Sequence, residues 1–263
     1  MHTGRQVFGE PIVTETEKKP PNPAEEIWRK QCDQYPISLY GALFWLAALV
    51  SAQIGLQWLA ERYSWRVELG GTTLSLALAV MVVMTPALLF YWRVRKKSPF
   101  STLGLSLARL KGDLALTLVA IAVLAAFYAL VVGAVLLYMH VFTDDPRAGF
   151  SDFLARALIV DRPAVHIISV VVFFPVLEEI WYRGLMYTPL RDEFGKWWAI
   201  ILLSIVFAAA HGSIPINQFF GGLVFAWVYE RRGTLVAPIL LHAAGNGSLV
   251  LAGYAAQAYG LIP

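Results

Sequence analysis

One stretch decides how this chain folds, His166-Ile-Ile-Ser-Val-Val-Val-Phe-Phe-Pro-Val-Leu-Glu178-Glu179-Ile-Trp-Tyr-Arg183. It begins like a membrane-embedded helix and then carries two adjacent carboxylates. An ionised side chain near the centre of a bilayer costs at least ~2.5–3.5 kcal/mol. Such side chains face the protein interior, pair with other groups and mark functional sites. The stretch therefore predicts a functional site inside a membrane.

The composition of the whole chain agrees with a membrane protein. Of its 263 residues, 58% are hydrophobic and 15% are charged, and the mean hydropathy is +0.60. A soluble domain carries about 25% charged residues. The Lys and Arg residues lie beside apolar runs, as the orientation rule for membrane proteins requires, so we expect the lipid bilayer and no nucleic acid as a partner. The single Cys32 excludes an internal disulfide framework.

The apolar runs predict an all-α fold, a polytopic helical membrane protein. A span needs roughly 20 apolar residues, and on this measure we expect about seven transmembrane helices, within a range of about six to eight. The predicted spans are residues 37–59, 72–92, 114–141, 163–183, 197–211, 218–229 and 236–259. The run 218–229 is short for a span.

Basic clusters predict the orientation of these spans. Arg93-Val-Arg-Lys-Lys97 and Glu230-Arg-Arg-Gly233 predict cytoplasmic loops. The N-terminus then lies inside and the C-terminus outside, with Asp144, Asp145 and Asp152 in an outer loop. Residues 1–34 are predicted to form a polar, loosely ordered cytoplasmic tail, and residues 35–263 a helical membrane domain. We expect a multi-pass protein of a bacterial inner (plasma) membrane.

Polar residues recur at a spacing of four in the C-terminal half of the chain, and residues four apart share one face of a helix. The three pairs are Glu179 with Arg183, Phe207 with His211, and His242 with Asn246. Counted from the inner basic and aromatic markers at ~1.5 Å per residue, Glu178, His211 and His242 all lie roughly 15–21 Å deep. The site is therefore predicted at one level between helices of the C-terminal half.

A carboxylate, two imidazoles and an amide at one depth predict hydrolysis. Glu178 would take a proton from water. His211 would orient that water or donate a proton to the leaving amine. Asn246, with His242 near it, would donate hydrogen bonds to the developing oxyanion.

The remaining members of the motifs are predicted to support this site. Glu179 pairs with Arg183, and Phe207 packs beside the reacting groups. A metal site is an open alternative, because Glu178, His211 and His242 are also a set of zinc ligands. Nothing in their spacing demands a metal.

Taken together and in this order, the motifs Glu178-Glu179-x-x-x-Arg183, Phe207-x-x-x-His211 and His242-x-x-x-Asn246 resemble one family. It is the CPBP family (CAAX protease and bacteriocin-processing, or Abi) of intramembrane proteases, related to the type II CAAX prenyl endopeptidase. The resemblance covers a catalytic core of residues 163–250.

The resemblance implies a protease that hydrolyses a peptide bond within the membrane. Glu178 would be the activating base, and His211, His242 and Asn246 would line the site. The implied substrate is a membrane-anchored or hydrophobic peptide or protein. The resemblance leaves a metal-independent glutamic protease and a metalloprotease open, and we favour the first.

Two other classes of protein remain open. One is a non-catalytic scaffold or immunity protein with the same fold. The other is a proton-coupled transporter in which Glu178 and the two histidines form a relay. Inverted repeats would favour the transporter, but the charged residues inside the predicted spans all lie in the second half of the chain.

Overall fold

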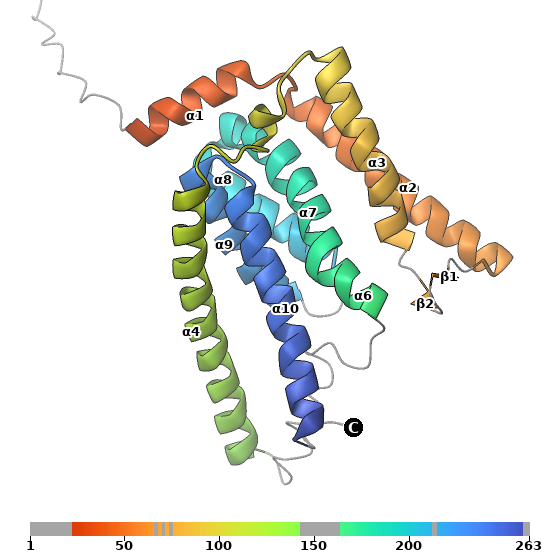
Figure 1. Ribbon diagram of the computed structural model, residues 1–263, viewed down its shortest axis with the longest axis vertical. Coiled ribbons are helices and arrows are strands. Elements are labelled where there is room, and N and C mark those ends of the chain that lie inside the picture. Colours follow the sequence, from red (N-terminus) through yellow and green to blue (C-terminus); the bar gives the residue numbers. More distant parts are fainter. Residues whose placement is uncertain are drawn as a thin grey trace, which may run out of the picture.

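The computed structural model describes residues 23–65, 68–69, 72–73, 76–142, 164–211 and 215–259. Nearly all of them are helical, which confirms the all-α prediction (Figure 1). The N-terminal half contains α1 (Pro23–Gln34), α2 (Leu39–Tyr63), α3 (Leu76–Phe90), the π-helix η1 (Tyr91–Arg95), the 3₁₀ turn η2 (Phe100–Leu103) and α4 (Leu110–Phe142). The only strands in the described part are β1 (Glu68–Leu69) and β2 (Thr72–Thr73), which pair antiparallel.

The C-terminal half is built from helices interrupted by π-helical turns. Its elements are α6 (Ala164–Ile168), the π-helix η3 (Ser169–Phe173), α7 (Phe174–Glu179), the π-helix η4 (Ile180–Tyr187), α8 (Thr188–Ala209), α9 (Pro215–Arg232) and α10 (Val236–Ala258). In Figure 1, α7 and α10 lie in front of α8 and α9, and α4 runs along one side. The predicted outer loop with Asp144, Asp145 and Asp152 lies outside the described residues.

Within the described ranges, five helical segments have the length and composition to cross a membrane. They are Leu39–Tyr63, Leu76–Arg95, Leu110–Phe142, Ala164–Ala209 and Val236–Ala258. The predicted spans 163–183 and 197–211 are two arms of one segment, which breaks at Gly195. There the backbone has φ 76° and ψ 168°, a conformation that glycine adopts without steric cost. The 18 residues of α9, predicted as a short span, are not among the five.

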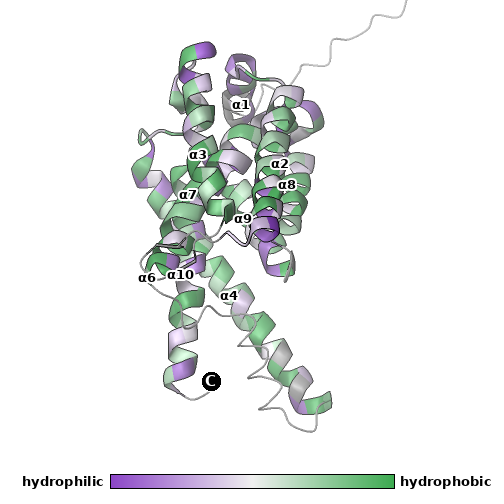
Figure 2. Cartoon of the chain, turned by 90° about the vertical axis from the view of Figure 1, so that its right-hand side faces the viewer, coloured by the Kyte–Doolittle hydropathy of each residue, from purple (hydrophilic) through white to green (hydrophobic). Residues whose placement is uncertain are grey.

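The outer surface of these helices is apolar. Hydrophobic residues run along most of their length in Figure 2. On α2 and α4, large side chains such as Phe44, Ile54, Leu118 and Leu130 are more than half exposed. A monomeric soluble protein rarely exposes apolar patches larger than a few hundred Å². The fold is that of a multi-pass membrane protein.

The N-terminal segment differs from its prediction where the structure describes it. Residues 23–34 form α1 instead of a loosely ordered tail, because Trp28 is buried to 2% exposure. Its indole nitrogen donates to the carbonyl oxygen of Glu230 at 2.8 Å, and its ring packs on Tyr187 and Tyr229. These contacts fix α1 across the ends of α8 and α9. Residues 1–22 lie outside the described part.

A second buried contact fixes α4 to the turn between α9 and α10. Asp113 is fully buried and accepts hydrogen bonds from Arg232 Nε at 2.6 Å and from Thr234 Oγ1 at 2.9 Å. The turn contains Gly233 at φ 64°, in the left-handed region that favours glycine. This anchor sets where α10 starts and therefore how far along its axis His242 lies.

Candidate active site

The two glutamates lie in α7, a short α-helical segment between two π-helices. In η3 the N–H of Phe174 bonds to the carbonyl oxygen of Ser169, five residues back. The second π-helix, η4, begins directly after Glu179. Such π-helical turns occur frequently at functional sites. Glu178 is 9% exposed and Glu179 is fully buried.

Glu179 forms a buried ion pair with Arg183, as the spacing predicts. Arg183 NH1 lies 2.9 Å from Glu179 Oε1, and neither side chain is exposed. The other guanidinium nitrogen of Arg183 donates to the carbonyl oxygen of Gly222 on α9 at 3.0 Å. His242 Nδ1 on α10 also bonds Glu179 Oε1, at 3.0 Å. Glu179 and Arg183 therefore join three helices.

Gly222 lets α9 approach closely enough for this contact. A Cβ atom at this position would lie 3.1 Å from the Cα of Ser204 on α8, which is tighter than ordinary packing allows. The glycine brings its own carbonyl oxygen to Arg183. The four-residue spacings in the sequence do not mark Gly222, so its role was missed.

Glu178 has a different environment from its neighbour. Its Oε2 atom lies 3.7 Å from His242 Nε2 and 3.9 Å from His211 Nε2. This oxygen is buried and has no hydrogen-bond partner among the described residues. The three side chains come from α7, from the end of α8 and from α10. The structure thus brings together three residues that the sequence placed at one depth.

In each histidine, the hydrogen bond made by Nδ1 determines which ring nitrogen carries the hydrogen. His211 Nδ1 lies 2.8 Å from the carbonyl oxygen of Phe207, which can only accept, so Nδ1 donates. His242 Nδ1 donates in the same way to the Glu179 carboxylate. In a neutral imidazole the second nitrogen is then an acceptor. Both Nε2 atoms therefore present lone pairs on the side of Glu178.

Aromatic rings hold the two imidazoles in place. Phe207 packs against His211 with ring centroids 4.6 Å apart, and against His242 at 5.6 Å. Phe225 on α9 stacks on His242 at 4.7 Å with an interplanar angle of 21°. The guanidinium carbon of Arg183 lies 4.9 Å from the centroid of Phe207 and 5.4 Å from that of Phe225. Phe225 was not predicted, because no polar partner at helical spacing marks it.

Asn246 lies one helical turn beyond His242 on α10. Its amide nitrogen donates to the carbonyl oxygen of Val170 in η3 at 2.8 Å. One of its two N–H groups is therefore used within the protein. The predicted contact with an oxyanion stays a prediction.

Glu178 Oε2 and the Nε2 atoms of His211 and His242 are the three atoms that would bind a zinc ion. Two ligands of a tetrahedral zinc ion at 2.0–2.1 Å lie about 3.4 Å apart. The separations of 3.7 and 3.9 Å between Glu178 and the histidines are longer. No group of His, Cys, Asp or Glu side chains in the described ranges could hold a metal ion. No step below passes through a metal.

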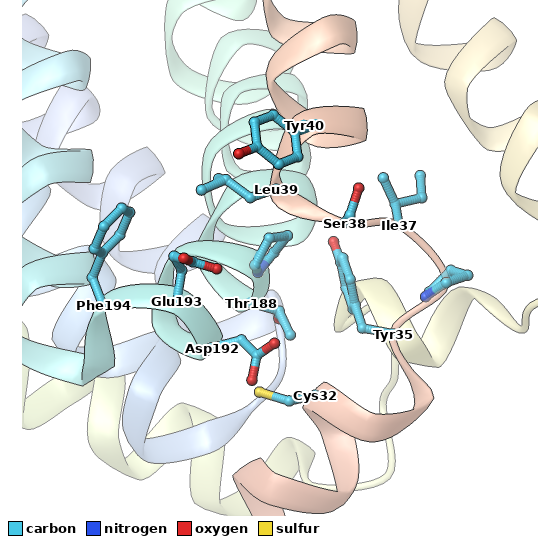
Figure 3. Close-up of a pocket in the computed structure, with 12 residues that line it drawn as sticks. Cys32, Tyr35, Ile37, Ser38, Leu39, Tyr40, Thr188, Asp192, Glu193 and Phe194 are labelled. Carbon is cyan, nitrogen blue, oxygen red and sulfur yellow. The ribbon is translucent and has the colours of Figure 1, made fainter.

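A cavity of about 440 Å³ lies elsewhere, between the α1–α2 connection and the start of α8 (Figure 3). Residues such as Cys32, Tyr40, Asp192 and Phe194 line it. None of the predicted site residues is among its lining residues. The site is therefore defined by the convergence of its side chains and not by this cavity.

Comparison with known proteins identifies the part of the chain that holds the site. Residues 161–248 match the family model described as Rce1-like, type II CAAX prenyl endopeptidase Rce1-like. No curated protein and no solved structure matches. The matched region contains every predicted site residue, from Glu178 to Asn246. The match confirms the resemblance over these residues, which make up about a third of the chain.

Proposed function

We propose that this CAAX-type protease domain hydrolyses a peptide bond in a membrane-anchored or hydrophobic substrate, and that Glu178 activates the attacking water. The observation that carries the proposal is the Oε2 atom of Glu178. It is buried, it has no hydrogen-bond partner in the described part of the protein, and it lies within 4 Å of Nε2 of both histidines. A buried polar atom without a partner costs free energy. Glu179 Oε2 and Arg183 Nε also have no partner among the described residues, but only the Glu178 oxygen faces two imidazole nitrogens.

The distances suit one water molecule between the carboxylate and an imidazole. A water about 2.8 Å from both atoms fits separations of 3.7 to 3.9 Å. Both protein atoms are acceptors, so the two O–H groups of the water point at them. Its lone pairs are then directed away from the protein atoms, where a substrate carbonyl would lie.

Hydrolysis would proceed from this arrangement by proton transfer. Glu178 takes a proton as the water oxygen bonds the carbonyl carbon, and the carbonyl oxygen becomes an oxyanion. The C–N bond then breaks, and a proton returns to the amine as it leaves. His211, the more exposed imidazole at 28% against 6% for His242, would take this proton from Glu178 at Nε2 and pass it to the amine nitrogen. The second N–H of Asn246 would stabilise the oxyanion.

The proposal is tested with purified protein in lipid vesicles. The probes are an internally quenched farnesylated CAAX peptide and an unprenylated hydrophobic peptide, with products identified by mass spectrometry. We expect at least one probe to be cut, and His211→Ala to slow the cut by roughly 10²–10⁴-fold, the usual contribution of a general acid or base. A His211→Ala protein as active as the wild type would contradict the proposed proton transfer. Failure to cut either probe would favour the scaffold or the transporter.

Chelation tests the metal-independent form of the mechanism. We expect activity to survive prolonged treatment with 1,10-phenanthroline and EDTA, because the proposed proton transfer uses only Glu178 and the histidines. Metal analysis of the same sample should find zinc well below one atom per chain. Loss of activity that stoichiometric zinc restores would instead establish the metalloprotease.

Phe225→Leu tests whether the ring stacked on His242 supports the reaction. Aromatic pairs contribute about 0.5–1.5 kcal/mol beyond burial, so we expect kcat to fall roughly 2–10-fold with little change in KM. Phe219→Leu is the matched control, because Phe219 lies on the same helix and packs on Phe220. An equal loss in both variants would assign the effect to α9 as a whole.

A further inference from the structure

The carbonyl oxygen of Val170 receives its hydrogen bond from a different helix, and the sequence explains why. In the π-helical register of η3, the N–H of Phe174 bonds Ser169 five residues back. The next bond of this register would join residue 175 to Val170. Residue 175 is a proline, which has no backbone N–H. The carbonyl of Val170 is therefore left without its expected donor.

Asn246 provides a donor at this point. Its Nδ2 atom lies 2.8 Å from the Val170 oxygen. Inside a membrane protein a backbone carbonyl cannot turn to water, so neighbouring side chains replace the hydrogen bonds that a proline removes. The amide of Asn246 matches both the position and the chemistry of the missing N–H.

The same face of α10 makes a second contact with the glutamate segment. His242, one turn before Asn246, bonds Glu179. The first contact lies before Pro175 and the second lies after it. Together they fix both sides of the proline turn, and Glu178 follows Pro175 by three residues within that turn.

We propose that Asn246 has a positioning role besides the oxyanion contact proposed above: its first N–H supplies the hydrogen bond that Pro175 withholds, and so fixes the turn from which Glu178 reaches the two histidines. Its effect on catalysis rests on the proposed function, whereas its effect on stability does not. A misplacement of about 1 Å in a catalytic group can cost 10²-fold in rate. Loss of the bond would free the proline turn to shift Glu178 by such an amount.

A double-mutant cycle tests the stability half of this proposal. Asn246→Ala removes the donor, and Pro175→Ala restores an N–H within the helix. We expect Asn246→Ala to lower the Tm in detergent by about 2–4 °C, the shift from losing one buried hydrogen bond in a protein of this size. In the Pro175→Ala protein, the same Asn246→Ala substitution should lower the Tm by clearly less. Asn246→Asp, which keeps the size but cannot donate, should be no more stable than Asn246→Ala.

The effect on catalysis is measured with the four proteins of this cycle, which are the wild type, Asn246→Ala, Pro175→Ala and the double variant. We expect Asn246→Ala to lower kcat by roughly 10–100-fold with KM little changed. Pro175→Ala should recover part of that loss, which simple loss of packing at residue 246 would not allow. Recovery of the Tm with no recovery of kcat would overturn the positioning of Glu178. If the wild-type protein cuts no probe, the proposed function fails while the Tm cycle still decides the hydrogen bond.

Pro86 provides the matched control, since it is also a proline inside a helix, in α3. The effects of Pro86→Ala and Asn246→Ala on the Tm should add without coupling, because Pro86 lies in α3 and the Asn246 amide bonds Val170 in η3. If the Tm changes caused by Pro175→Ala and Asn246→Ala simply add in the double variant, the proposal is overturned. Equal coupling of Asn246 to both prolines would overturn it as well.

Discussion

Glu178→Gln is expected to abolish peptide cleavage and to leave the fold intact. Glutamine has the same shape, but its amide cannot take a proton from water. Removal of a general base costs typically 10²–10⁴-fold in rate, and we expect an effect at the upper end of that range. The Tm should not fall, because the substitution removes a buried carboxylate oxygen that has no hydrogen-bond partner in the described part of the chain. The measurement is cleavage of the two peptide probes in vesicles, beside a thermal unfolding curve.

Glu193→Gln is the matched control for this experiment. Glu193 is an exposed glutamate on α8 that lines the cavity of Figure 3, away from the site. Its substitution should leave cleavage unchanged. Wild-type rates in the Glu178→Gln protein would remove the protease mechanism, and the scaffold would then be the better account.

The largest effect on stability is expected from Arg183→Leu. This change removes the cation from Glu179, whose side chain is fully buried and keeps only the hydrogen bond from His242 Nδ1. Breaking a buried ion pair from one side costs about 3–5 kcal/mol. The bond from Arg183 to the carbonyl of Gly222 is lost in the same step. We expect a large fall in Tm in detergent and little folded protein in the membrane.

Two further variants separate the charge from the packing. Arg183→Leu combined with Glu179→Leu should be more stable than Arg183→Leu alone, because it leaves no uncompensated charge. Glu25→Gln, in an ion pair with Arg191 where Glu25 is 51% exposed, should cost no more than about 1 kcal/mol. A near-native Tm for Arg183→Leu would show that the pair does not hold these helices together.

The sequence predicted those contacts that depend on local geometry. The pairing of Glu179 with Arg183 follows from residues four apart on one helix, and the structure has it. The convergence of Glu178, His211 and His242 followed from counting residues inward from the basic and aromatic markers. This count succeeds because helix rise converts sequence distance into depth.

The contacts that escaped prediction depend on how helices pack. Two such contacts join α9 to its neighbours, the stacking of Phe225 on His242 and the bond from Arg183 to Gly222. No local sequence pattern in α9 predicts them. The docking of α1 through Trp28 was missed for the same reason, because its partner Glu230 is far away in sequence. A hydropathy pattern also could not show that residues 163–183 and 197–211 belong to one segment broken at Gly195.

The shared oxygen of Glu179 has a consequence for motion. Because Oε1 accepts from both Arg183 and His242, and Arg183 also holds Gly222, three helical elements are joined through one buried point. The segment of α7 and η4, with α9, α10 and the α8 helix that packs on η4 and α9, would then move as a single rigid body. Any opening that admits a substrate would have to occur along the border of this body, where α2, α3 and α4 pack against it.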